Sequence, residues 1–253
     1  MTSFIFAFVI AAMAFGSGLL GLALHEWLPE KHAPERSREM IGAITGLLGL
    51  LLALVLGTLV GSAYTLYATQ KTEIETLAAR ALQLDSALDA FGPETQPARD
   101  GLRQALTHHY NAIWGEDKSG LADVNVKSVV AGTRMLEQFL LSLQPKTDAQ
   151  RQLLSTAHAA AGQIAQTEIT MLLQLATGIS KPMLAIVVCW ALLLFCGYGL
   201  VSPHNGTVVV SMALGAIAVA SAIFLIVELS HPYEGVFQVP SGAIVETMKA
   251  LGP

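Results

Sequence analysis

Four runs of apolar residues without a charged side chain dominate the hydrophobic pattern of this sequence. They cover residues 4–24, 41–63, 183–201 and 208–227. A helix needs about 20 apolar residues to cross the hydrocarbon core of a bilayer, so each run predicts a membrane-spanning helix. No Lys or Arg precedes the first run, which is unlike a secretory signal peptide. We therefore expect the first run to be a retained anchor.

The segment between the second and third runs, residues 64–182, holds most of the charged residues. It predicts a helical domain outside the membrane. Residues 62–91 contain neither Gly nor Pro, so we expect the second membrane helix to continue beyond the bilayer and to end at Gly92 and Pro93. Apolar residues three and four positions apart define one face of this extension: Ile74, Leu77, Ala81, Leu84, Leu88 and Phe91.

Three further helices are predicted in the same domain. Two of them cover residues 98–114 and 122–143. The third begins at Thr147, where Gln150 three positions later resembles a capping box. This last helix is expected to be almost continuous with the third membrane span.

The predicted fold is an all-α membrane protein with four transmembrane helices and a helical stalk domain. Transmembrane helices 1 and 2 fall in residues 1–63, the stalk in 64–182, transmembrane helices 3 and 4 in 183–230, and a C-terminal segment in 231–253. Within that last segment, residues 241–251 predict a short amphipathic helix. It lies either on the membrane surface or against the stalk.

Composition supports the membrane interpretation and excludes several classes of protein. Apolar residues make up 53% of the chain and charged residues 13%, with a mean hydropathy of +0.55, whereas about a quarter of a soluble domain is charged. Fourteen Lys and Arg against 19 Asp and Glu exclude a basic nucleic-acid-binding protein. Two cysteines exclude a disulfide scaffold.

Enzymatic motifs are missing from the sequence. There is no Walker loop and no HExxH motif, and the adjacent His108 and His109 point about 100° apart on a helix, so they cannot share a metal ion from that geometry. We expect both histidines on a solvated face. We therefore predict no catalytic residue, no metal site and no cofactor, and a protein that is not an enzyme.

The second apolar run contains the pattern that says most about function. Leu50, Leu54 and Thr58, at i, i+4 and i+8, form one stripe. If several copies surrounded an axis, this stripe would form stacked rings, and an apolar ring can gate a pore by dewetting. The alternative is that these leucines face lipid or a neighbouring helix. Small residues let helix backbones approach closely in lipid, so helix packing is expected at two GxxxG pairs: Gly42 with Gly46, and Gly57 with Gly61.

Glu228 is the one carboxylate close to membrane depth. A charge at that depth is costly and is often functional. Because Glu228 lies at the end of the fourth run, beside Ser230, His231 and Glu234, we expect it to reach headgroups or water. A role in an ion pathway is the alternative.

Four segments of the sequence resemble the bacterial bestrophin-like family. The first is Glu-Leu-Ser-His-Pro-Tyr-Glu-Gly at residues 228–235, whose signature positions are Glu228, Pro232 and Gly235; the others are residues 84–88 with 91–94, residues 147–151 and residues 199–205. The resemblance implies a homo-oligomeric, pentameric ion channel in a bacterial inner membrane. Its expected partners are the lipid bilayer, copies of itself and inorganic ions, with no nucleic acid.

The resemblance also implies which helix lines the pore. In bestrophins the second membrane helix carries three bulky apolar residues ahead of and within a Val-Leu-Gly element. The Val-Leu-Gly element at residues 55–57 would map Leu50, Leu54 and Thr58 onto those pore-lining positions. Thr58 departs from the pattern, because it is smaller and polar.

Two further features differ from the family. Animal bestrophins bind calcium through an acidic cluster after the last membrane helix, whereas only Glu228 and Glu234 occur here, so we predict no calcium gating. The positive residues Lys31, Arg36 and Arg38 in the first short loop favour that loop in the cytoplasm. That topology puts the stalk and both termini outside, while bestrophins keep the helical domain in the cytoplasm.

A different class of function remains open beside the channel. The long polar stalk and the absence of an evident charged selectivity ring are also typical of a non-conducting, membrane-anchored structural or interaction protein. A secondary transporter comes third, because the sequence offers no inverted repeat from which to build a substrate site.

Overall fold

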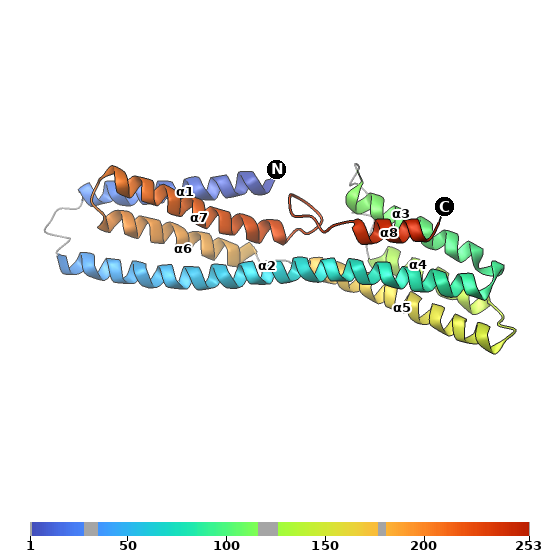
Figure 1. Cartoon of the computed structure of the whole chain (residues 1–253). Helices are drawn as coiled ribbons and strands as arrows, with labels where there is room; N and C mark the ends of the chain where they lie inside the picture. The colour runs from blue at the N-terminus through green and yellow to red at the C-terminus, as the bar shows by residue number, and fades with distance from the viewer. Residues whose placement is uncertain (1, 28–34, 116–125, 177–180, 253) are drawn as a thin grey trace. The chain divides into compact units, whose positions relative to one another are not determined.

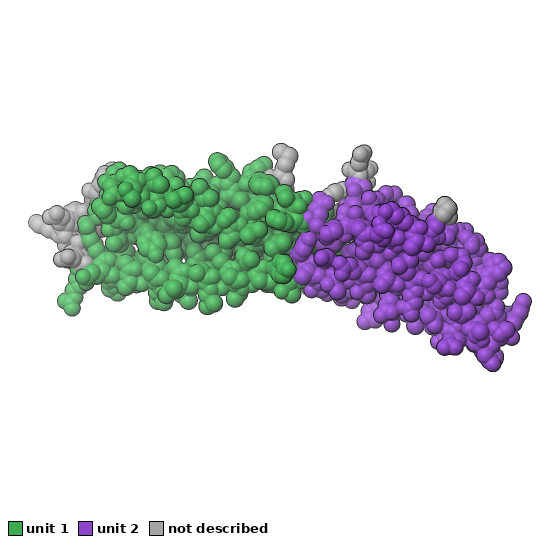
Figure 2. Space-filling model, viewed as in Figure 1, with its two compact units in different colours: residues 1–66, 179–237 green, residues 67–178, 238–253 purple. Residues whose placement is uncertain are grey.

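The computed structural model describes residues 2–27, 35–115, 126–176 and 181–252, and their regular structure is entirely helical. It confirms the predicted all-α fold with four candidate membrane-spanning helices. The chain forms two compact units, shown in different colours in Figure 2. Unit 1 contains residues 1–66 and 179–237, and unit 2 contains residues 67–178 and 238–253.

Unit 1 holds the four candidate membrane spans. They are α1 (Thr2–Trp27), the first part of α2 (Glu35–Phe91), α6 (Lys181–Val201) and α7 (Gly206–Leu229). In the view of Figure 1, α6 runs alongside α2, and residues of α1, α2, α6 and α7 share one apolar core. Each span satisfies its own backbone hydrogen bonds, which is the condition for crossing hydrocarbon.

Helices α1 and α6 approach each other closely because both carry glycine where they cross. A Cβ atom on Gly21 would lie 2.2 Å from the carbonyl oxygen of Cys196, and one on Gly199 would lie 2.2 Å from the carbonyl oxygen of Gly18. Neither position tolerates a side chain. Helix α2 contributes large apolar side chains such as Leu52 to the core that it shares with α6 and α7.

Unit 2 contains the second part of α2 and the smaller helices. These are the 3-10 turn η1 (Pro93–Thr95), α3 (Gln96–Trp114), α4 (Val126–Ser142), α5 (Asp148–Ala176) and α8 (Gly242–Ala250). The apolar face predicted for the α2 extension is confirmed, because its six residues, Ile74 to Phe91, are all buried. The core of the unit packs this face against α3, α4 and α5.

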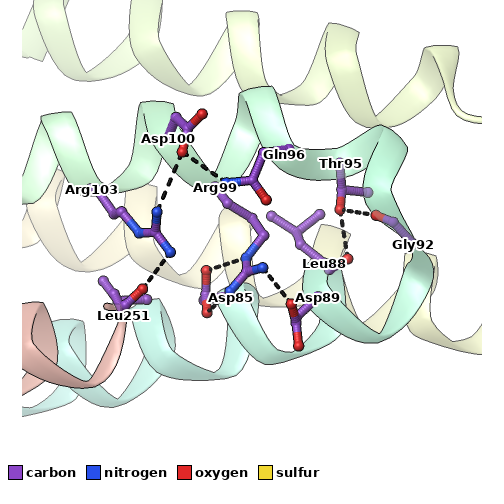
Figure 3. Close-up of polar contacts among 10 residues, drawn as sticks. All are labelled: Asp85, Leu88, Asp89, Gly92, Thr95, Gln96, Arg99, Asp100, Arg103 and Leu251. Carbon is purple, nitrogen blue, oxygen red and sulfur yellow. Dashed lines mark hydrogen bonds and ion pairs between the residues drawn. The ribbon is translucent and has the colours of Figure 1, made fainter. Parts of the chain in front are cut away.

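The end of α2 lies at the predicted position. Phe91 is its last residue, and Gly92 adopts a φ of 143°, which an L side chain rarely adopts. Figure 3 shows the hydroxyl of the buried Thr95 between two backbone carbonyls, 2.6 Å from that of Leu88 and 2.7 Å from that of Gly92. These contacts satisfy carbonyls at the end of the helix.

An arginine on α3 fastens that helix to α2 (Figure 3). The guanidinium of Arg99 binds both carboxylate oxygens of Asp85, from Nε at 2.7 Å and from Nη2 at 3.0 Å, and its Nη1 binds Asp89. The hydrogen bond to Asp85 raises the pKa of Arg99 further above its ordinary value. Arg99 and Asp85 are both largely buried, so the pair fixes the register between the two helices.

The start of α5 confirms the Thr147 cap. The backbone N–H of Gln150 donates to Thr147 Oγ1 at 3.1 Å, while the Gln150 side chain accepts from the N–H of Lys146 at 2.8 Å and donates to the carbonyl of Phe91 at 3.0 Å. Helix α5 ends at Ala176 and α6 begins at Lys181. The predicted continuity between them, like the predicted helix start at residue 122, lies outside the described residues.

The C-terminal helix α8 packs against unit 2, which decides between the two sequence-based alternatives. Ile244 and Leu251 are buried, and α8 contacts α3. Arg103 of α3 donates to the carbonyl of Leu251, and the indole N–H of Trp114 donates to the carbonyl of Val239 at 2.9 Å.

Candidate functional site

The candidate pore-lining residues lie on one exposed face of α2 in unit 1. Leu50 is 72% exposed and Leu54 is 65% exposed, and Thr58 is exposed as well. The opposite side of the helix, with Leu52 and Leu59, is buried against the rest of the unit. We define the α2 outer face by its exposed residues in the apolar run: Ala43, Ile44, Leu47, Leu50, Leu51, Ala53, Leu54, Gly57, Thr58, Gly61 and Ser62.

The outer face changes character along the helix. Up to Leu54 it is mostly large aliphatic side chains, and from Gly57 onward it is glycine and hydroxyl residues. Thr58 Oγ1 donates to the carbonyl of Val55 at 2.9 Å, and the hydroxyl of Thr65 bonds the carbonyl of Gly61 in the same way. Because the helix itself accepts these protons, the hydroxyl groups add little polar cost to the face.

The four glycines predicted to pack helices have open space around them in the described chain. A Cβ atom added to Gly42, Gly46, Gly57 or Gly61 would meet nothing within 4 Å. Packing at these positions therefore stays a prediction, and it concerns another molecule. Close glycine contacts between helices of the described chain include those of α1 with α6 and that of Gly197 on α6 with Thr45 on α2. None of them follows from the GxxxG pairs in the sequence.

The three signature residues at the end of α7 come together in one turn. The carboxylate of Glu228 is 2% exposed and accepts the backbone N–H of Val236. Pro232 is also buried, and Gly235 adopts a φ of 81°. A Cβ atom on Gly235 would lie 2.0 Å from Oε1 of Glu228, so the carboxylate occupies the space that glycine leaves.

This geometry corrects the sequence-based expectation for Glu228. Its side chain does not reach headgroups or water, because the turn that follows α7 covers it. Burying a carboxylate at the end of a membrane span requires donors. The turn supplies the N–H of Val236, and only a glycine at residue 235 lets the backbone come this close.

Unit 2 contains a partly buried pair of titratable residues. His109 of α3 and Glu168 of α5 approach to 3.4 Å between Nδ1 and Oε1, with 27% and 17% of their side chains exposed. Burial raises the pKa of Glu168 from 4.5 to about 7. Burial and, to a lesser degree, the neighbouring His108 lower the pKa of His109 below 6.5.

The contact with Glu168 corrects the expectation that both His108 and His109 lie on a solvated face. His108 is exposed, as predicted, but His109 turns inward to Glu168. Among the described residues no group of three or more His, Cys, Asp or Glu side chains is arranged to hold a metal ion. The partners are 59 positions apart in sequence, so no local pattern pointed to their contact.

Comparisons with known proteins agree on one family. The family model for the Bestrophin-like domain matches residues 9–244. No curated protein matches the sequence. Three crystal structures of mutant forms of a bacterial bestrophin homolog from Klebsiella pneumoniae share the fold, with TM-scores of 0.67, 0.62 and 0.63 at 13%, 15% and 14% identity, over 97%, 96% and 96% of both chains.

Replacing Gly235 by Ala should destabilise the protein. The φ of 81° strains any L side chain, which costs about 1–3 kcal/mol, and the new Cβ displaces the Glu228 carboxylate. Thermal unfolding of the detergent-solubilised chain measures the loss. Gly242→Ala is the matched control, because that glycine has open space and no positive φ, and it should leave the unfolding midpoint nearly unchanged. Equal midpoints for the two variants would contradict the assigned role of the turn.

The Glu168→Gln variant should differ from the wild type in a pH-dependent way. A carboxyl group whose pKa is higher in the folded state contributes stability below its unfolded pKa of 4.5, and this contribution is lost as the pH rises to about 7. The amide does not ionise, so it should be more stable than the wild type above pH 7, by roughly 3 kcal/mol at most.

The advantage of Glu168→Gln should disappear toward pH 4.5. The lowered pKa of His109 acts in the opposite direction, because this group loses stability as the pH falls below 6.5. Because His109 contacts Glu168, its own titration changes when the carboxylate is removed, so the same comparison is made in a His109→Gln background, where the difference isolates Glu168. A difference that is constant from pH 5 to pH 8 would contradict the assignment.

Proposed function

Because this chain belongs to the bestrophin-like family, we propose that it forms a homo-oligomeric ion channel whose pore is lined by α2. The observation that carries the proposal is the α2 outer face, which is exposed in the single chain and free of charged residues. Copies arranged around an axis would cover this face. The family resemblance supports five copies.

Rings of Leu50 and Leu54 would form the narrow part of such a pore. Large apolar side chains around an axis exclude water from a constriction and so raise the barrier to ions. One turn further, glycine and hydroxyl residues widen the passage, because Gly57, Thr58 and Gly61 carry little or no side-chain bulk. Ions entering that section would meet hydroxyl oxygens and helix backbone in place of leucine.

The proposed location is a bacterial inner membrane. An even number of spans puts both termini and unit 2 on the same side, and the count of positive residues in the first short loop, including Arg36 and Arg38, puts that side outside the cytoplasm. The family resemblance favours the opposite orientation.

One observation favours the alternative of a structural or interaction protein. Helix α4 in unit 2 exposes Met135 and Leu141, and large apolar side chains in water mark surfaces that bind other proteins. Such a protein would purify with its partner and would conduct no ions.

Subunit count and ion flux test the proposal together. The mass of the detergent-solubilised complex should correspond to five copies, and the protein reconstituted in liposomes should pass ions. A complex of one or two copies, or a pentamer that carries no flux under any ionic condition, would end the channel proposal.

Shortening Leu54 to Ala should raise the flux. Lowering the barrier at the apolar ring by about 1 kcal/mol corresponds to a roughly fivefold faster passage. Leu214→Ala on α7 is the matched control, because Leu214 is 64% exposed, as Leu54 is at 65%, but lies on a helix away from the proposed axis. Liposome flux at equal protein content measures both variants. The same flux from both would show that Leu54 faces lipid.

A further inference from the structure

Helix α2 meets α6 at a close contact in which a threonine fills the space that a glycine leaves. Thr45 of α2 is 5% exposed, and a Cβ atom added to Gly197 of α6 would lie 2.5 Å from its Oγ1, 3.2 Å from its Cγ2 and 3.4 Å from its Cβ. One turn further along α2, a Cβ atom added to Gly49 would lie 3.2 Å from Cδ1 of Leu194. Each helix therefore places a side chain over a glycine of the other.

Thr45 and Leu54 point in opposite directions from the axis of α2. They are nine positions apart, and nine residues make about two and a half turns of a helix. The burial agrees with this geometry, because Thr45 is covered while Leu54 is 65% exposed on the α2 outer face. A group that thickens the contact with Gly197 therefore displaces α2 in the direction in which Leu54 points.

We propose that the contact of Thr45 with Gly197 sets how far the α2 outer face reaches toward the axis of the channel. This inference rests on the proposed function, in which Leu50 and Leu54 form apolar rings around that axis. Thr45 acts through these leucines and touches no ion, so it is a positioning residue. Its side chain is the spacer that holds α2 at its distance from α6.

The shape of the side chains controls this distance because α2 spans hydrocarbon at this level. Lipid tails are as apolar as the helix, so the hydrophobic effect does not press α2 against α6. Thr45 is branched at Cβ and has no flexible end that could move aside. A methyl group added to Gly197 would need about 1 Å more room to reach an ordinary contact distance from Oγ1 of Thr45.

Helix α6 cannot give this room, because α1 supports it at the same level. A Cβ atom on Gly21 of α1 would lie 2.2 Å from the carbonyl oxygen of Cys196, the residue before Gly197. Gly199 of α6 is equally close to the carbonyl oxygen of Gly18. The α2 outer face, in contrast, is exposed in the described chain. The strain of a thicker contact is therefore relieved by a movement of α2.

Two substitutions that act in opposite directions test the positioning role. Gly197→Ala thickens the contact, so it should push α2 toward the axis, narrow the rings and lower the ion flux into liposomes by roughly fivefold or more. Thr45→Ala removes the spacer and should raise the flux. A contact that only stabilised the fold would lower the unfolding midpoint in both variants and would change the flux in the same direction, which would overturn the proposal.

The double variant Thr45→Ala/Gly197→Ala should restore the wild-type flux. It leaves the two Cβ atoms 3.4 Å apart, which is an ordinary contact distance. Gly16→Ala on α1 is the matched control, because a Cβ atom there meets nothing within 4 Å, and it should not change the flux. A double variant that conducts as poorly as Gly197→Ala would overturn the proposal. If Gly197→Ala does not assemble, Thr45→Ala decides, and an unchanged flux from it would overturn the proposal as well.

Oxidative cross-linking between copies measures the displacement of α2 without ion flux. Leu54→Cys is introduced into a full-length chain in which Cys189 and Cys196, the free cysteines of the described chain, are replaced by Ala. The rate of cross-linking at residue 54 should rise with Gly197→Ala, fall with Thr45→Ala and return to its starting value in the double variant. Equal rates in all of them would overturn the positioning role. No cross-link in any of them would instead refute the proposed function, because Leu54 would then face no axis.

Discussion

Helix α2 has to satisfy two solvents with one unbroken backbone. Its first part lies in an apolar unit with no charge from residue 41 to residue 63, and its second part continues through charged sequence to Phe91. Intrahelical hydrogen bonds make the backbone acceptable in both environments. At the transition, the side chain of Gln70 is fully buried and donates to Gln174 Oε1 at 2.8 Å, so a polar group at this level has its partner inside unit 2.

The continuity of α2 also explains why its two buried faces could be predicted with different success. In unit 2 the apolar residues recur with the helical period against a polar background, and the predicted face from Ile74 to Phe91 is buried in full. From residue 41 to residue 63 of α2 there is no charged residue and most positions are apolar, so periodicity carries little information about which side is buried. The spacing of Leu50 and Leu54 places them on one side of a helix. Because the other sides of this helix are apolar too, the sequence does not tell which side contacts the neighbouring helices.

Helix ends could be predicted from residues close together in the sequence, whereas contacts between residues far apart in the sequence could not. The end of α2 at Gly92 and the cap at Thr147 depend on residues within four positions of each other, and both are confirmed. The contacts of His109 with Glu168 and of Gln150 with the carbonyl of Phe91 join residues 59 positions apart. Their side chains give no hint of a partner, because a histidine or a glutamine on a helix is equally compatible with water.

The candidate pore face was located, but its partner could not be derived from one chain. An interface around a symmetry axis needs the second copy to complete it, and the open space at Gly57 and Gly61 is what an unpartnered half of such an interface would leave. The same open space would suit lipid. Gly21 on α1 and Gly199 on α6 differ from Gly57 and Gly61, because the helices that meet at them belong to the same chain. Their backbones are already in contact.

The buried Glu228 has a consequence for the turn that follows α7. A carboxylate free to reach water would leave the turn after α7 without its central acceptor, whereas the buried one holds the N–H of Val236. Three residues later the carbonyl of Val239 accepts from Trp114 of α3. Between these two hydrogen bonds, the carbonyl of Gln238 accepts from the hydroxyl of Tyr67 at 3.4 Å. A carboxylate that the sequence led us to expect at headgroups or in water is, in this structure, the acceptor that orders the turn after α7.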